Sequence, residues 1–103
     1  MEREPLKLSF KIDPVKAMKN GYSYDEVINT AERVCLNRNC IKERRGVFKG
    51  HGNQYDLCTV GEALLALIKK EWFRECVSEM YLITPNGREN VVDIYKKKGY
   101  KFG

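Results

Sequence analysis

The residues best suited to chemistry in this chain are its cysteines and its single histidine. Zinc prefers thiolate and imidazole ligands, and four of them in a tetrahedron form a closed structural site. The chain spaces such groups as Cys-x4-Cys, then ten residues to the histidine, then six residues to another cysteine. This pattern predicts a structural zinc site formed by Cys35, Cys40, His51 and Cys58.

A second interpretation of these residues stays open. Cys35 lies on the apolar side of a predicted helix, so it also fits a small residue of the hydrophobic core that binds no metal. The six-residue gap between His51 and Cys58 is longer than in most zinc sites of this type, and Cys76 is an alternative ligand. The same residues therefore also fit inert thiols and a histidine exposed to solvent.

The segment Gly50-His51-Gly52-Asn53, placed between a predicted hairpin and a helix, resembles the ββα-metal nucleases of the HNH type. The resemblance implies that His51 acts as general base and that Asn53 orients it. That chemistry also needs a metal ion held by further His, Asp or Asn side chains on the following helix. This chain has one histidine and no matched ligand pair on that helix, so we predict no nuclease activity.

The tail, residues 90–102, resembles the closing segment of GNAT acetyltransferases, in which an Asn precedes an aromatic residue, a Lys and a Gly-aromatic strand. The resemblance implies an acetyl-CoA loop before the long helix, where this chain has only Val60-Gly61-Glu62-Ala63. A single glycine does not supply the run of amides that holds a pyrophosphate. Since the chain also lacks a P-loop, a nucleotide fingerprint and a protease-like Cys-His-Asn order, we predict that it is not an enzyme.

The first elements that must position these residues are marked clearly. Apolar and polar residues alternate over 6–12, which predicts a strand with one buried face. Asp13-Pro14 then predicts a short helix that runs to about Asn20 and is stopped by Gly21. Ser23-Tyr24-Asp25-Glu26 has the form of a capping box and predicts a second helix that ends near residues 37–39.

The second half of the chain is predicted to contain two hairpins and a long helix. Two strand-like runs around residues 50–53 predict a hairpin over 46–58. A capping box at 59–62 then predicts an apolar helix that reaches residue 80. Pro85-Asn86-Gly87 favours a turn, so we expect a second hairpin with 91–95 as its returning strand. A strand followed by a short helix is the alternative for that segment.

Size and composition are typical of one domain. The chain has 103 residues, of which 43% are hydrophobic and 32% charged, and these values fit a globular protein. No apolar run approaches the length of about 20 residues that spans a membrane, and the first five residues include three charged ones and no apolar stretch. We expect a cytoplasmic protein that forms a single α+β domain over 1–103, with one N-terminal strand, two to three helices, two β-hairpins and zinc as a stabilising element.

The net charge of +5 is gathered mainly in two basic groups, one within 38–49 and one within 96–101. Such groups permit binding to nucleic acid or to an acidic protein surface, although a solvated surface has the same composition. We take as candidate partner-binding residues Lys42, Arg44, Arg45, Lys49, Lys96, Lys97, Lys98 and Lys101.

Two resemblances indicate what the partner is. In size, cysteine content and mixed basic surface, the chain resembles small phage-encoded inhibitors of the anti-CRISPR type. That resemblance implies a protein of the host cytoplasm that occludes a nucleic-acid-processing nuclease without catalysis. The Pro-Asn-Gly turn with residues 98–102 resembles the wing of winged-helix regulators, which implies DNA binding. Because tyrosine, tryptophan and arginine anchor protein interfaces, we favour a protein partner and keep a winged-helix-like or zinc-stabilised nucleic-acid-binding regulator as the alternative.

Overall fold

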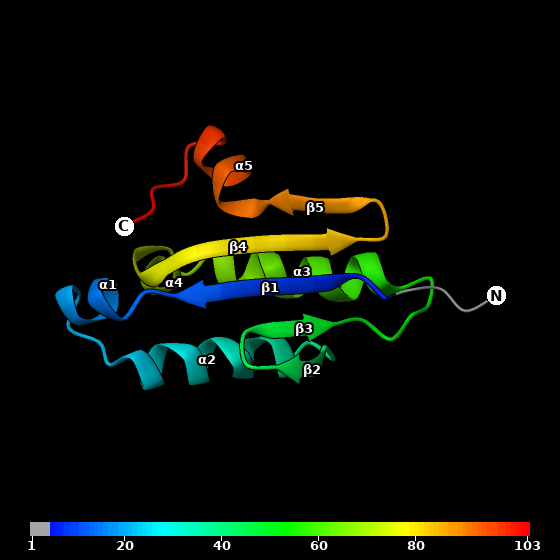
Figure 1. The fold of residues 1–103 in the computed structure, drawn as a ribbon, viewed down its shortest axis with the longest axis horizontal. Helices are drawn as coiled ribbons and strands as arrows, with labels where there is room; N and C mark the ends of the chain where they lie inside the picture. The colour runs from blue at the N-terminus through cyan, green and yellow to red at the C-terminus, as the bar shows by residue number, and fades with distance from the viewer. Residues whose placement is uncertain (1–4) are drawn as a thin grey trace.

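The computed structural model describes residues 5–103, which fold around a five-stranded antiparallel sheet in the order β2-β3-β1-β4-β5 (Figure 1). The strands are β1 (Lys7–Ile12), β2 (Ile41–Arg44), β3 (Val47–Lys49), β4 (Val77–Thr84) and β5 (Gly87–Asn90). The helices are α1 (Pro14–Lys19), α2 (Tyr24–Leu36), α3 (Asp56–Ile68), α4 (Glu71–Cys76) and α5 (Val91–Lys97). The predicted α+β class is confirmed. Within the described part, three helices of six or seven residues stand beside the two longer ones.

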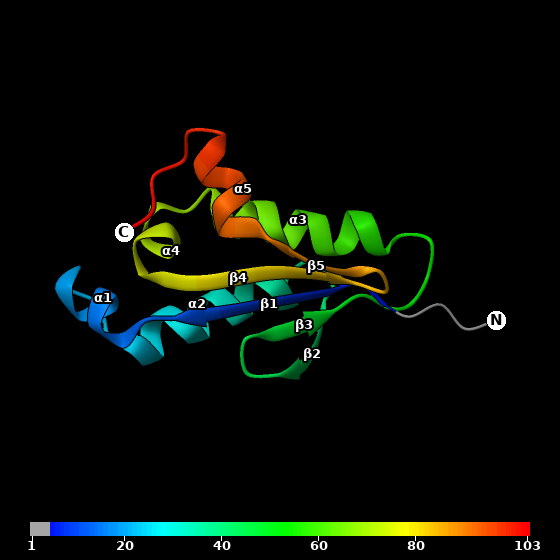
Figure 2. The ribbon, with the colours of Figure 1, turned by 45° about the horizontal axis from the view of Figure 1, so that its top comes forward.

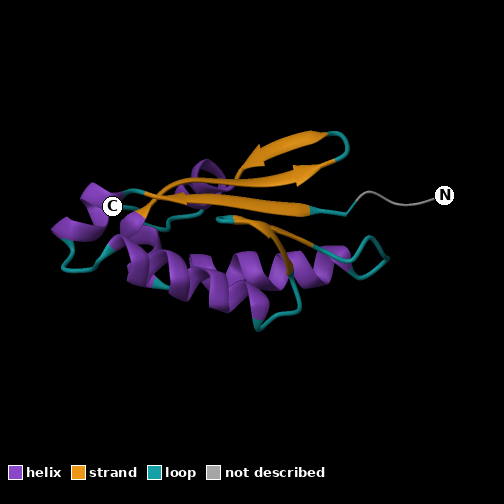
Figure 3. Ribbon diagram, turned by 60° about the horizontal axis from the view of Figure 1, so that its bottom comes forward, coloured by secondary structure: helices purple, strands orange, loops and turns teal. Residues whose placement is uncertain are grey.

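The order β1, helices, β2–β3, helices, β4 is the split β-α-β arrangement of ferredoxin-like domains, to which β5 and α5 are added at one edge. Figure 3 shows α2 and α3 on one side of the sheet. None of the helices within residues 5–103 combines the length and apolar character needed to cross a membrane.

The alternation predicted for the first strand is confirmed, and it separates the two faces of the sheet. Leu8, Phe10 and Ile12 are buried on the side of the helices. There the ring of Phe10 packs edge-on against Phe73, with ring centroids 5.6 Å apart. The residues between them on β1 lie on the opposite face, because successive side chains of a strand point to opposite sides.

The first two helices begin where their capping residues predict. The Asp13 carboxylate accepts a hydrogen bond from the Val15 amide at 2.8 Å, and Ser23 Oγ accepts one from the Glu26 amide at 3.1 Å. Both contacts satisfy amides that have no partner within the first turn of a helix. Gly21 follows α1 in the left-handed region, at φ 81°.

The first hairpin lies upstream of its predicted position. Residues 47–49 pair with 41–44 instead of 55–58, and α3 begins at Asp56. The turn is made by Arg45-Gly46, and Gly46 has φ 75° with an added Cβ only 2.5 Å from the Phe10 carbonyl oxygen. The sequence predicted the turn at residues 50–53. The chain turns earlier, at Gly46, because the backbone there lies so close to β1 that only a glycine fits.

The predicted long helix is divided. Helix α3 ends at Ile68, Lys70 is extended, and α4 ends at Cys76, so that Met80 lies in β4 opposite Phe10. Pairing with β1 therefore overrides the helical spacing of the apolar residues that follow. The Pro85-Asn86 turn is confirmed, but β5 stops at Asn90, and residues 91–95 form helix α5, as the alternative prediction had it.

Candidate functional site: the open face of the sheet

One face of the sheet has no helix over it within residues 5–103, and we call it the open face (Figure 3). Its members follow from the strand register, because residues directly opposite each other on paired strands share a face. Lys7 lies opposite Lys49 and Ile83, and Ser9 lies opposite Val47 and Tyr81. The open face comprises Lys7, Ser9, Lys11, Ile41, Arg44, Val47, Lys49, Glu79, Tyr81, Ile83, Arg88 and Asn90.

The middle of the open face is more apolar than its rim. Val47 is only 6% exposed, although it lies outside the hydrophobic core cluster on the helix side. Tyr81 is partly exposed, and the Arg88 guanidinium lies over its ring, 4.6 Å from the centroid. Arginine and tyrosine stacked in this way present two flat groups to a partner.

Positive charge dominates the rim. Five basic side chains belong to the open face, against Glu79 and the Glu43 carboxylate, which contacts Lys7 from the bulge in β2. Two of the basic residues are paired: Lys11 with Glu79 at 3.7 Å, and Lys7 with Glu43 of β2 at 2.9 Å. The hydrogen bond from Lys7 lowers the pKa of the Glu43 carboxyl group below its usual value. Within residues 5–103, the other three cations form no ion pair: Arg44, Lys49 and Arg88.

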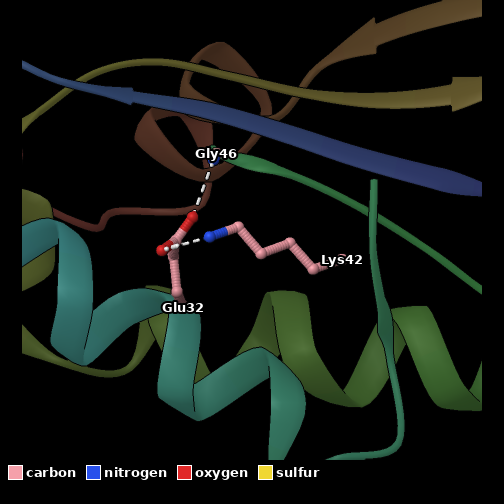
Figure 4. A network of polar contacts seen from close by, with 3 residues as sticks. All are labelled: Glu32, Lys42 and Gly46. Carbon is pink, nitrogen blue, oxygen red and sulfur yellow. Dashed lines mark hydrogen bonds and ion pairs between the residues drawn. The ribbon is translucent and has the colours of Figure 1, made fainter. Parts of the chain in front are cut away.

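A buried carboxylate holds the β2–β3 hairpin in place (Figure 4). Glu32 of α2 is 7% exposed, and its Oε2 accepts a hydrogen bond from the Gly46 amide at 3.1 Å. Its Oε1 accepts one from Lys42 Nζ, also at 3.1 Å. Lys42 therefore turns toward the helices and anchors the hairpin, whereas Lys49 and Arg44 of the same hairpin face the open side.

A second buried carboxylate organises the loop between β3 and α3. Asp56 accepts hydrogen bonds from the amides of His51, Gly52 and Asn53, at 3.0 to 3.3 Å, and from the Leu6 amide at 3.2 Å. Burial raises the pKa of Asp56, but these amides together outweigh it and hold the pKa below the usual value of 3.8. The carboxylate thus ties the loop to the start of the sheet.

The predicted zinc ligands are only partly brought together. Cys35 and Cys40 are buried at the end of α2, where the Cys40 amide donates to the Cys35 carbonyl at 3.2 Å. Cys58 is exposed on α3, and not on a returning strand as predicted. His51 lies in the loop after β3, and its Nε2 donates a hydrogen bond to the Asn39 carbonyl at 2.7 Å.

Two of these predicted ligands, Cys35 and Cys40, are buried thiols. Burial, with Cys40 and Glu32 nearby, raises the pKa of the Cys35 thiol to about 12, and burial also raises the pKa of Cys40. Zinc binds the thiolate form of cysteine. Within residues 5–103, no three Cys, His, Asp or Glu side chains are grouped so that they could hold one metal ion. Zinc therefore stays a prediction from the sequence, and no part of the proposal below depends on it.

The basic candidates from the sequence lie at opposite edges of the sheet (Figure 2). Arg44, Arg45 and Lys49 belong to the β2–β3 hairpin, and the remaining group lies on α5 and the tail beyond β5: Lys96, Lys97, Lys98 and Lys101. The Arg74 side chain donates to the Lys101 carbonyl at 3.1 Å and so fixes the tail on α4. The candidates taken from the sequence did not include Lys7 and Lys11 of β1. The alternation of these lysines with the buried residues of the strand could have identified them.

A comparison of the sequence with protein-family models found no match, and a comparison with curated proteins found no similar sequence.

Proposed function

We propose that the protein binds single-stranded nucleic acid along the open face of its sheet, without catalysing a reaction. The observation that carries the proposal is the excess of basic side chains around Tyr81 and Arg88 on a face that no helix covers within residues 5–103. Proteins bind single strands by combining such a basic surface, which contacts the phosphates, with aromatic and guanidinium groups on which bases stack.

The shape of this face favours a single strand over a duplex. Proteins commonly read a duplex by placing a helix or a two-stranded ribbon in a groove, but α2 and α3 lie on the other side of the sheet (Figure 3). Hairpin β4–β5 does not project as a wing, because β4 pairs with β1 in the sheet. On the open face, the partly exposed Tyr81 and Ile83 and the exposed Ile41 offer contacts to unpaired bases.

Charge also argues against occlusion of a nuclease channel by this face. A channel that holds nucleic acid is itself positively charged, and it would repel the five basic side chains of the open face. The inhibitor interpretation therefore requires a different surface of the protein.

A protein partner is the second candidate function, and α3 favours it. Tyr55, Leu57 and Leu65 are 61%, 70% and 40% exposed. Leu57 and Leu65 lie on one side of the helix with Gly61 between them, and an added Cβ at Gly61 would meet no atom within 4 Å. Exposed apolar residues gathered on one helix are typical of a protein interface.

Fluorescence anisotropy with a labelled oligonucleotide, offered as a single strand and as a duplex, tests the main proposal. We expect preference for the single strand and weaker binding by Lys49→Gln. Lys69→Gln is the matched control, because Lys69 is exposed at the end of α3 on the helix side. Equal loss in both variants would indicate non-specific attraction to a basic protein, and oligonucleotide binding lost through Leu57→Ser alone would place the strand on α3 and contradict the proposal.

A further inference from the structure

Two lysines face each other at one end of the open face. Lys7 of β1 and Lys49 of β3 are directly opposite in the antiparallel register. Like charges in this position destabilise a sheet. The Lys7 ammonium is compensated by Glu43 at 2.9 Å, but Lys49 has no ion pair within residues 5–103. An anion bound beside Lys49 would balance the positive charge that Glu43 leaves uncompensated.

The same lysines line a cavity of about 320 Å³ at this end of the sheet. Its size lies within the range of about 300 to 1,000 Å³ that is usual for small-molecule sites. Lys7, Lys49 and Glu43 supply its charged groups, and Pro5, Ile83 and Pro85 supply apolar wall. The cavity therefore offers two cations for an anion, a carboxylate that accepts hydrogen bonds, and an apolar surface for a ring.

We infer that this cavity binds the terminal nucleotide of a strand, with its phosphate between Lys7 and Lys49. The inference rests on the proposed function, because the nucleotide is the end of the strand that the open face binds. A terminal phosphomonoester carries a charge of about −1.5 to −2 at neutral pH, so it can pair with Lys49 and also share Lys7 with Glu43, whereas the single charge of an internal phosphodiester balances Lys49 alone. Glu43 accepts a hydrogen bond from a hydroxyl or N–H group of the nucleoside.

The position of the cavity agrees with binding of a strand end. It lies where β1 begins and where β3 and β4 end, and the Pro85 turn adjoins it. A strand that follows the sheet from Lys11 toward Lys7 reaches its last residue there.

The test compares one oligonucleotide in three forms: 5′-phosphorylated, 3′-phosphorylated and without a terminal phosphate. We expect one phosphorylated form to bind roughly tenfold more tightly than the form without phosphate, as a charge-assisted contact allows. Lys49→Gln and, separately, Lys7→Gln should abolish this preference. Arg88→Gln, which lies outside the cavity, should weaken all three forms equally. Urea unfolding confirms that each variant is folded.

The outcomes separate this inference from the proposed function. Equal affinity for all three forms overturns the terminal-nucleotide site and leaves the open face as a binding surface. A preference that survives in both lysine variants also overturns it. If none of the three forms binds, both the proposed function and the inference fail.

Discussion

The clearest test of the structure itself is to remove the carboxylate that anchors the β2–β3 hairpin. In Glu32→Met the side chain keeps about the same volume but can no longer accept a hydrogen bond. The Gly46 amide then remains buried without a partner, which costs about 1–3 kcal/mol. Loss of the Lys42 contact adds less than about 1 kcal/mol, because the Lys42 side chain is 43% exposed and solvent screens the pair.

We therefore expect Glu32→Met to lower the free energy of unfolding by about 2–3 kcal/mol. Glu32→Gln retains one oxygen for the Gly46 amide and should cost only about 1 kcal/mol. For a domain of this size, the larger loss lowers Tm by roughly 10 °C. Urea unfolding followed by circular dichroism measures the free energies, and hydrogen exchange reports on the Gly46 amide.

Glu62→Met is the matched control, because Glu62 is exposed on α3 and its replacement should change stability by no more than about 0.5 kcal/mol. The reasoning is refuted if Glu32→Met is as stable as the wild type. It is also refuted if the Gly46 amide exchanges as fast as an unprotected amide in the wild type.

Three further predictions concern the loop, the turn and the thiols. Asp56→Asn should cost about 2–4 kcal/mol at neutral pH, since an amide replaces one of two oxygens that accept from buried N–H groups. Because the folded pKa of Asp56 lies below the unfolded value, the stabilisation is complete above about pH 3.8 and is lost as pH falls through the folded pKa; acid titration of the variant should lack this loss. Gly46→Ala should destabilise by more than about 2 kcal/mol, since its Cβ would clash with a carbonyl at positive φ. Cys58→Ser should change Tm little, because Cys58 is exposed on α3.

Each of these has a control or an opposing outcome. Asp25→Asn, at an exposed position in the first turn of α2, should show a smaller loss than Asp56→Asn. Gly61→Ala should stabilise by about 0.5–1 kcal/mol, because the added methyl group lies in open space on a helix. If a chelator and Cys58→Ser lower Tm to the same extent, Cys58 is a zinc ligand, as the sequence predicts. The positions described above for the predicted ligands would then be wrong.

Local signals determined the parts of the fold that the sequence predicted correctly. The alternation of β1 and the caps at Asp13 and Ser23 act between residues at most four positions apart, so they are visible without knowledge of the fold. The hairpin and the division of the long helix depend on contacts between distant residues. The chain turns at Gly46, where its backbone lies against the Phe10 carbonyl group. Met80 has an extended backbone because it pairs with β1.

The candidate site, like the fold, could be predicted from the sequence only where local signals were sufficient. Lys49 and Arg44 were identified from charge alone, but charge could not show that Lys42, their neighbour, turns inward to Glu32. The open face itself joins residues from five strands, and its membership requires the strand order. Cys58 was placed with the other ligands because the segment around it reads as a strand, whereas the Asp56 contacts make it the start of a helix.

The salt dependence of oligonucleotide binding tests the central claim most directly. If three to five cations of the open face contact phosphates, the logarithm of the association constant should fall against the logarithm of salt concentration with a slope of about −2 to −3.5 for a single strand. Lys49→Gln should reduce the magnitude of that slope by about 0.7, and Lys69→Gln should leave it unchanged. Absence of binding at low salt, or a slope that Lys69→Gln alters as much as Lys49→Gln, would contradict the account.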